Sequence, residues 1–427
     1  MRTSAPLLAY RLTGILCGLC LCFFLFSIYK PISSSNFPTP VSDGEKYFRL
    51  AAEGPKGVVA PFSGRIFHPL LARLTSRVFN IRMEEAFFIV SALFLVLWVC
   101  CVFLLLDASS FIHSFAYSLV FAYPFVGLIA RQFYYPEVAH AALLSAFLVF
   151  LKLKRERVGL ILLLLLLLTR ETTMLLVAVL LAQIILFHRW KYAFGVAMVT
   201  GLGLTIVYMA TRQGAPNPEH LPGFVYLALK VPFNFLRNLL GVELVTDAIW
   251  YCQPVISWRV PDILQIGNIR TIGLCSWNPT RALNTLGALL TVFGLWPTVL
   301  LWAARTRRLP QAQWMKTAAA YGVLAYFVGT SVGADVSRLI SQGWPLILVA
   351  MASIAQSVDR KGGLLTMLSV FCLTISWLPK LVRSVLVHFL HIELAILSSA
   401  TIVLLSLAVH VYLYKFLIIR YPGEFKS

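Results

Sequence analysis

Long apolar runs separated by short basic segments make up most of this chain. A helix needs about 20 apolar residues to cross a bilayer, and several runs approach or exceed that length. Hydrophobic residues form 59% of the chain and charged residues only 12%, about half the charged fraction typical of soluble domains. We therefore expect an all-α, polytopic membrane protein. The predicted helices cover residues 8–29, 84–106, 111–129, 138–152, 192–211, 283–303, 317–333, 344–358, 364–379 and 393–415.

Residues 158–187 pose a topological question, because "LLLLLLLTRETT" at 162–173 is followed at once by more apolar sequence. Basic residues flank the whole stretch, at 152–157 and at 189–191. One helix would put these clusters on opposite sides of the membrane, whereas cytoplasmic segments should carry the excess of Lys and Arg. Two short helices joined at Thr169–Thr173 keep both clusters in the cytoplasm. This choice predicts about twelve crossings, with both termini cytoplasmic.

The chain divides into three parts on this topology. Residues 1–211 form an N-terminal membrane module, which begins with a retained first helix and includes an external loop at 30–83. Residues 212–282 form a second external loop, and 283–427 hold the C-terminal helices. The net charge of +19 arises from basic residues between the apolar runs, so no nucleic-acid partner is predicted.

Two helices are predicted along the external membrane surface. Residues 64–80 place their apolar side chains on one helical stripe, with Arg65 and His68 mostly outside it. A second surface helix, within "FVYLALKVPFNFLRNLLGV", should be interrupted by Pro232. His68 is read either as a hydrogen-bonded loop histidine or as a functional group. Cys252 and Cys275 are candidates for a disulfide in the second external loop, since the other cysteines fall inside apolar runs.

Carboxylates from distant parts of the sequence all come out on the external side. Each also has a structural explanation: Asp43 in a turn, Glu137 in a helical first turn, Arg170–Glu171 as a buried pair, and Asp335–Arg338 as an i,i+3 pair. Their shared placement at helix ends on one face favours a common site. The acids concerned are Asp43, Glu45, Glu137, Glu171 and Asp335.

Four short stretches together resemble integral-membrane glycosyltransferases of the GT-C superfamily, of the bacterial type that uses polyprenyl-phosphate-linked sugars. They are "VSDGEKYFRL" after the first helix, "RQFYYPE" and "LLTRETT" at external helix ends, and "DVSRLISQGWP" near the C-terminus. The resemblance covers mainly residues 8–210, with an echo at 333–345. It implies a GT-C-like helical module whose site faces away from the cytoplasm. The sequence has Asp-Gly-Glu where the family commonly has Asp-x-Asp or Asp-Asp, which leaves open the base and any divalent metal.

The resemblance assigns the catalytic acid to Asp43, with Glu45 as the alternative and Glu137 as a second acid. Sugar transfer from a lipid phosphate needs a base for the acceptor hydroxyl and cations for the departing phosphate. Arg170, Arg338 or Arg65 would bind the donor phosphate. The substrate-orienting residues would be Glu171, Asp335 and His68.

The expected partners are a lipid-linked sugar donor, a glycan, lipid or protein acceptor, and membrane lipid. No cofactor is assigned. Two other functions stay open: a transporter or flippase for a lipid-linked saccharide, which predicts charges at mid-membrane, and a non-catalytic scaffold that docks through 212–282. The expected location is the bacterial plasma membrane, with the endoplasmic reticulum as the alternative.

Overall fold

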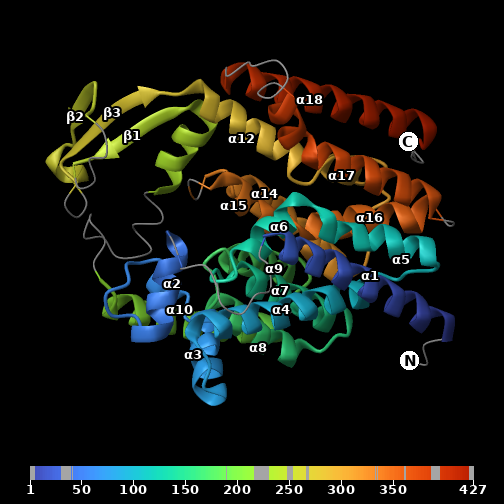
Figure 1. Cartoon of the computed structure of the whole chain (residues 1–427), viewed down its shortest axis with the longest axis horizontal. Coiled ribbons are helices and arrows are strands. Elements are labelled where there is room, and N and C mark those ends of the chain that lie inside the picture. Colours follow the sequence, from blue (N-terminus) through green and yellow to red (C-terminus); the bar gives the residue numbers. More distant parts are fainter. Residues whose placement is uncertain are drawn as a thin grey trace.

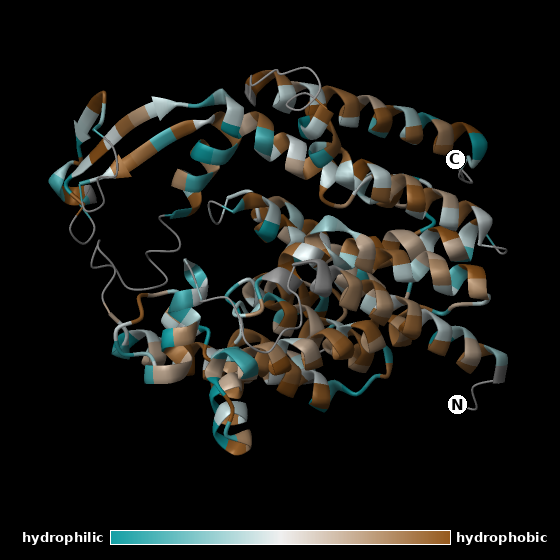
Figure 2. Ribbon diagram, viewed as in Figure 1, coloured by the Kyte–Doolittle hydropathy of each residue, from teal (hydrophilic) through white to brown (hydrophobic). Residues whose placement is uncertain are grey.

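The structure is a computed structural model that describes residues 5–29, 40, 42–188, 190–215, 230–247, 253–265, 269–331, 333, 335–359, 362–385 and 395–422. It is predominantly helical, as the apolar runs predict, and the described part contains five helices long and apolar enough to cross a membrane, or up to seven if each of two bent pairs is one span. The twelve expected crossings include shorter helices, so the long apolar helices of the described chain account for only part of that number. Figure 2 shows apolar residues concentrated on the central helices and hydrophilic ones on α2 and the segments between helices.

The N-terminal part begins with α1 and then forms two helices before the next long apolar helix. The bounds are α1 (Ala5–Tyr29), α2 (Asp43–Glu53), η1 (Phe62–Gly64), α3 (Phe67–Phe79) and α4 (Met83–Leu105). The helix predicted along the membrane surface is found as α3, where the exposed side chains include Leu70, Leu74, Val78 and Phe79. The structural alternative for Asp43 was a turn, whereas Asp43 is the first residue of helix α2.

The helices that follow are shorter, and several are broken. They are α5 (Phe111–Ser118), η2 (Leu119–Ala122), α6 (Pro124–Arg131), α7 (Glu137–Lys152), α8 (Glu156–Leu167), α9 (Thr173–Leu186) and α10 (Trp190–Gln213). The single helix expected at 111–129 is interrupted at Tyr123, whose backbone is extended because the next residue is Pro124.

The break predicted at Thr169–Thr173 is confirmed, since α8 ends at Leu167 and α9 begins at Thr173. Two backbone carbonyls that lead into the turn have hydrogen-bond partners within the protein. Thr173 Oγ1 donates to the carbonyl of Leu166 at 3.0 Å, and Phe67 N donates to the carbonyl of Leu168 at 3.1 Å. A turn at membrane depth requires such internal partners, because lipid supplies none.

The C-terminal part contains two bent helix pairs. Its helices are α12 (Pro279–Thr291), α13 (Trp296–Arg305), α14 (Gln313–Val328), α15 (Val336–Ile340), η5 (Ser341–Gly343), α16 (Pro345–Ser357), α17 (Gly363–Ser384) and α18 (Ala395–Arg420). The helix expected at 283–303 is bent by 63° between α12 and α13. Gly294 lies in this bend at φ 54°, and a Cβ there would lie 2.1 Å from the Cys372 carbonyl oxygen, so the close approach requires glycine.

The segment predicted as an irregular loop contains a small sheet. Its strands β1 (Val242–Thr246), β2 (Ile256–Arg259) and β3 (Thr271–Trp277) pair antiparallel in the order β1-β3-β2, with η4 (Asp262–Leu264) after β2. Gly273 pairs with both Val245 and Ser257, so β3 is the central strand. The described chain is helical from residue 230 into the π-helical turn η3 (Leu236–Leu240). Pro232 lies in the first described turn, and residues 216–229 lie outside the described chain, so the interruption at Pro232 stays a prediction.

The helices pack into one core that joins both halves of the chain. Trp98 of α4 lies edge-on to Trp344, with 5.1 Å between ring centroids. Contacts at one end of the bundle link segments expected in the cytoplasm: Asp107 pairs with Arg11 at 3.0 Å and with Lys152 at 3.1 Å. Figure 1 shows both chain termini at the right of the view and the sheet and α2 at the left.

Candidate functional site

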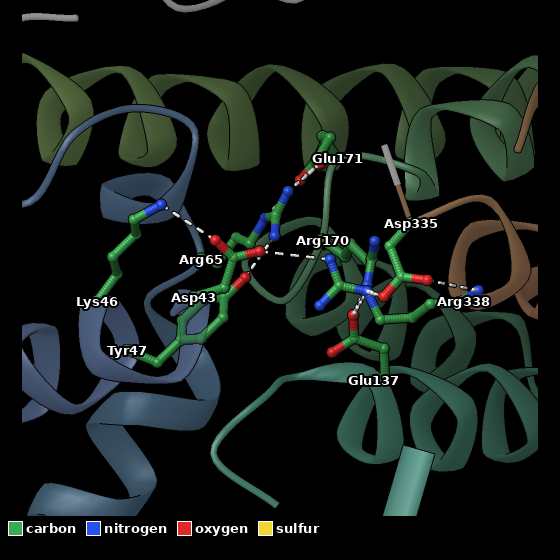
Figure 3. A network of polar contacts seen from close by, with 9 residues as sticks. All are labelled: Asp43, Lys46, Tyr47, Arg65, Glu137, Arg170, Glu171, Asp335 and Arg338. Atoms are coloured by element: carbon green, nitrogen blue, oxygen red, sulfur yellow. Dashed lines mark hydrogen bonds and ion pairs between the residues drawn. The ribbon is translucent and has the colours of Figure 1, made fainter. Parts of the chain in front are cut away.

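Charged side chains from five separate segments meet at the end of the bundle that carries α2 (Figure 3). Carboxylates and cations alternate in this group, so each carboxylate faces at least one basic side chain. The group, here called the charged cluster, consists of Asp43, Lys46, Tyr47, Arg65, Glu137, Arg170, Glu171, Asp335 and Arg338.

Glu137 and Arg170 form the buried base of the charged cluster. Glu137 begins α7, so its carboxylate lies at the positive end of the helix dipole. Arg170 Nη1 donates to Glu137 Oε1, and both side chains are almost inaccessible, at 2% and 1% exposure. A second cation, Arg338, places its Nε 3.6 Å from the same oxygen. Glu137 therefore holds two arginines in position.

Arg65 and Glu171 form a two-pronged pair, the geometry in which arginine binds carboxylate most strongly. Arg65 Nε donates to Glu171 Oε2 at 2.8 Å and Nη2 donates to Oε1, while Nη1 donates to the hydroxyl of Tyr47. Burial opposes ionisation of both partners, but Arg65 lowers the pKa of Glu171 overall and Glu171 raises the pKa of Arg65. Burial raises the pKa of Tyr47 to about 12. The pair is therefore ionised and Tyr47 is neutral at physiological pH.

Arg338 joins the two halves of the chain. Its Nη2 lies 3.4 Å from Asp43 Oδ2, and its Nε lies 3.4 Å from Asp335 Oδ2. Its guanidinium stands over the ring of Tyr135, 4.7 Å from the centroid, which is a cation–π contact. Asp335 caps α15 by accepting from Arg338 N at 3.4 Å, and Asp43 also accepts from Lys46 Nζ at 3.0 Å.

A cavity of about 730 Å³ opens over the charged cluster. Its lining includes three carboxylates (Asp43, Glu171 and Asp335) and five cations (Arg65, Arg170, Lys230, Arg237 and Arg338). Two more carboxylates lie behind the lining: Glu137 contacts Arg170 and Arg338, and Glu243 lies 3.7 Å from Arg237. Apolar side chains form the remaining wall, among them Leu175, Val231, Phe233, Val328 and Leu339. The cavity therefore combines a charged floor, rich in arginine, with an apolar wall.

The four carboxylates differ in accessibility. The Glu137 side chain is 2% exposed, and Glu171, although 33% exposed, has both oxygens bound by Arg65. Asp43 is 24% exposed and Asp335 51% exposed, and both line the cavity. Asp43 and Asp335 are therefore the two carboxylates of the cluster that line the cavity without forming a two-pronged pair with an arginine.

Two sequence candidates are not brought into the charged cluster. Glu45 is exposed on α2 and does not line the cavity. His68 is fully buried in α3, 3.2 Å from Ser91 Oγ, and packs against the rings of Phe87 and Phe94. Burial lowers the pKa of His68 to about 4. His68 therefore lies in a helix and not in a loop, and its ring is away from the charged cluster.

Other cavity residues were not identified from sequence. Lys230 and Arg237 come from the helical segment after α10, which looked like a plain surface helix. Asn238 follows, and it is buried and donates from Nδ2 to the carbonyls of Thr330 and Gly333, each at 2.8 Å. This amide ties the segment to the loop that carries Asp335.

The remaining predictions concern cysteines and metal. Cys275 in β3 is disulfide-bonded, but Cys252 lies outside the described residues, so their pairing stays a prediction. Among the described residues, no group of three or more His, Cys, Asp or Glu side chains could hold a metal ion. The carboxylates of the cluster face Arg338, Arg65 and Arg170 and not one another, which does not suit a divalent cation.

Comparisons with protein-family models, with curated proteins and with solved structures found no match to this chain.

Proposed function

We propose that this protein is a GT-C-type glycosyltransferase that moves a sugar from a polyprenyl-phosphate donor to an acceptor hydroxyl. The observation that supports the proposal is one cavity whose lining brings together an accessible carboxylate, five basic side chains and an apolar wall. A lipid-linked sugar has a matching division into polyprenyl chain, phosphate and sugar. The acceptor would be a glycan, a lipid or a protein.

In the proposed reaction Asp43 is the general base. The acceptor oxygen attacks the anomeric carbon, the bond from that carbon to the phosphate oxygen breaks, and polyprenyl phosphate leaves with the bonding electrons. The acceptor proton passes to Asp43. A correctly placed base contributes about 10²- to 10⁴-fold to such a step.

We assign Arg338 to the departing phosphate, because it lines the cavity 3.4 Å from Asp43. Glu137 and Asp335 also contact Arg338 and hold it in position. Lys230 and Arg237 lie on the opposite wall, from the segment after α10. Arg65 and Arg170 are engaged by Glu171 and Glu137, so we assign them to holding the floor of the site. Negative charge develops on the phosphate as the bond breaks, and fixed cations stabilise it.

The proposal includes the full topology. Counting α5–α6, α12–α13 and α15–α16 as one crossing each and the short α8 and α9 as separate crossings gives twelve, with both termini in the cytoplasm and the cavity on the opposite face. The contacts of Asp107 with Arg11 and Lys152 at the far end from the cavity support this arrangement. The bacterial plasma membrane is the proposed location.

The test is a purified-protein assay with a panel of polyprenyl-phosphate sugars, each offered with glycan, lipid and peptide acceptors. Transfer of labelled sugar with release of polyprenyl phosphate is the expected result. Movement of the intact lipid-linked sugar across reconstituted vesicles without bond cleavage would instead identify a flippase. Neither transfer nor movement with any donor would leave the scaffold reading and contradict the proposal.

A further inference from the structure

Helix α3 has two apolar faces, and only one of them packs against the protein. On the packed face His68 and Ala72 are fully buried. On the other face Leu70, Leu74 and Val78 recur every four residues, a spacing that puts them on one side of a helix. Their side chains are 48%, 48% and 73% exposed. These three residues, here called the apolar stripe, are the kind of surface that marks an interaction site.

Two arginines lie along one edge of the apolar stripe. Arg73 is half-buried and Arg77 is exposed, and all thirteen residues of α3 are described and include no Asp or Glu. Neither arginine has an ion pair or a side-chain hydrogen bond to any residue in the described part of the chain. The acids that follow in sequence, Glu84 and Glu85, belong to α4, where Glu85 pairs with Arg82 at 2.8 Å. Both guanidinium groups of α3 can therefore bind an anion from outside the protein.

The next helix fixes the position of α3 relative to the membrane. Asn80 ends α3 in the left-handed conformation, at φ 52°, and α4 begins three residues later at Met83. Helix α4 is long and apolar enough to cross a membrane. Figure 1 shows α3 projecting from the bundle, across the direction of the long helices α1 and α18. A helix that ends where a membrane-crossing helix begins, and that runs across it, lies along the membrane surface.

The start of α3 is tied to the charged cluster. Phe67 N donates to the carbonyl of Leu168 at 3.1 Å, and Arg65, two residues earlier, donates to Glu171. Leu168 and Glu171 belong to the turn between α8 and α9. Helix α3 therefore lies at the same end of the bundle as the charged cluster, and it meets the membrane leaflet on that side.

We infer that α3 is a docking surface for the headgroups of anionic phospholipid. The apolar stripe lies at the boundary of the acyl chains, and Arg73 and Arg77 bind lipid phosphate. Charge complementarity favours an anionic lipid, because each basic residue near a negatively charged membrane surface strengthens binding. A lipid layer suits the stripe better than a second copy of the chain does, since α4 continues directly from α3 into the membrane. This inference does not depend on sugar transfer.

The test records what position 74 touches in the full chain. The photoreactive residue p-benzoylphenylalanine replaces Leu74, the protein is reconstituted in nanodiscs of equal parts phosphatidylglycerol and phosphatidylcholine, and the adducts formed on illumination are identified by mass spectrometry. The charge variant is Arg73→Gln/Arg77→Gln. The matched control, Lys56→Gln/Arg259→Gln, removes two positive charges from exposed residues outside α3. Thermal unfolding of each variant shows that it is folded.

Position 74 should form phospholipid adducts in which phosphatidylglycerol is enriched over phosphatidylcholine. The enrichment should fall by up to about thirtyfold in the charge variant, and by about fivefold in Arg77→Gln alone, the milder change that keeps the test usable if the double variant unfolds. The control should keep the wild-type ratio. Equal adducts with the two lipids in the wild type, an unchanged ratio in the folded charge variants, the same fall in the control, or adducts with a second protein copy in place of lipid would overturn the inference.

Discussion

Arg338 Nη2 lies 3.4 Å from Asp43 Oδ2, although 295 residues separate the two in sequence. The contact joins α2, near the N-terminus, to α15, in the C-terminal part, across the floor of the large cavity. It places one cation beside the carboxylate proposed as base. The site therefore depends on both halves of the chain and not on the N-terminal module alone.

The buried Glu137–Arg170 pair should be the most sensitive part of the charged cluster. Removing one member leaves the other charge buried without its partner, at a cost of about 3–5 kcal/mol. We expect Glu137→Gln to lower the thermal unfolding temperature in detergent markedly. Arg82→Gln, which breaks the more exposed Arg82–Glu85 pair, is the control and should cost about 0–1 kcal/mol. Equal effects of the two substitutions would contradict the burial argument.

Asn238 should act as a positioning residue. Its amide holds the carbonyls of Thr330 and Gly333, and the loop that follows carries Asp335 and leads to Arg338. Asn238→Leu should cost about 1–3 kcal/mol through the carbonyls left without a partner, and it should lower kcat more than it raises KM. A variant with reduced stability and wild-type kcat would show that the amide supports the fold alone.

His68 should make stability depend on pH. Its pKa is about 4 in the folded protein and about 6.5 when exposed, so the unfolded chain binds more protons between these values. Stability should therefore rise with pH across this window, by up to about 1.4 kcal/mol per pH unit, and change little from this residue above pH 6.5. The groups around the ring are Ser91, Phe87 and Phe94, and Glu137 acts in the opposite sense by raising the His68 pKa. Unfolding temperatures measured from pH 4 to 8 should show a shallower slope for His68→Phe, and an unchanged slope would contradict the assignment.

The topology can be tested independently of activity. Glu53 is exposed on α2 near the cavity, and Arg157 is exposed in the first turn of α8 at the other end of that helix from the Thr169–Thr173 turn. A membrane-impermeant maleimide should label Glu53→Cys in spheroplasts, whose plasma membrane is intact and exposed. The same reagent should label Arg157→Cys only after permeabilisation. The reverse pattern would place the cavity in the cytoplasm.

The sequence predicted the largely helical, apolar character of the chain and the Thr169–Thr173 break, because hydropathy and basic flanks are local signals with a direct physical cause. The bend at Gly294 could not be predicted in this way, because it depends on the close approach of Cys372 from a distant helix. The sheet was also missed: its central strand contains Gly273 and Cys275 and is followed by Pro279, and the whole segment 212–282 was predicted as an external loop.

The acids of the site were identified for a similar reason. Asp43, Glu137, Glu171 and Asp335 are rare charges at the ends of apolar runs, and a consistent topology puts them on one face. Their partners were harder to identify. Tyr47 and Tyr135 are aromatic residues in a chain rich in them, and the pairing of Arg65 with Glu171 spans 106 residues without a local pattern.

The most direct test of the account is the rate of sugar transfer by Asp43→Asn, measured with the purified protein and the donor selected from the polyprenyl-phosphate panel. Glu53→Gln, a carboxylate on the same helix that lies outside the cavity, is the control. We predict that Asp43→Asn folds and inserts normally and loses at least about 10²-fold in kcat, while Glu53→Gln retains the wild-type rate. Transfer by Asp43→Asn at the wild-type rate would contradict the assignment of Asp43 as the base.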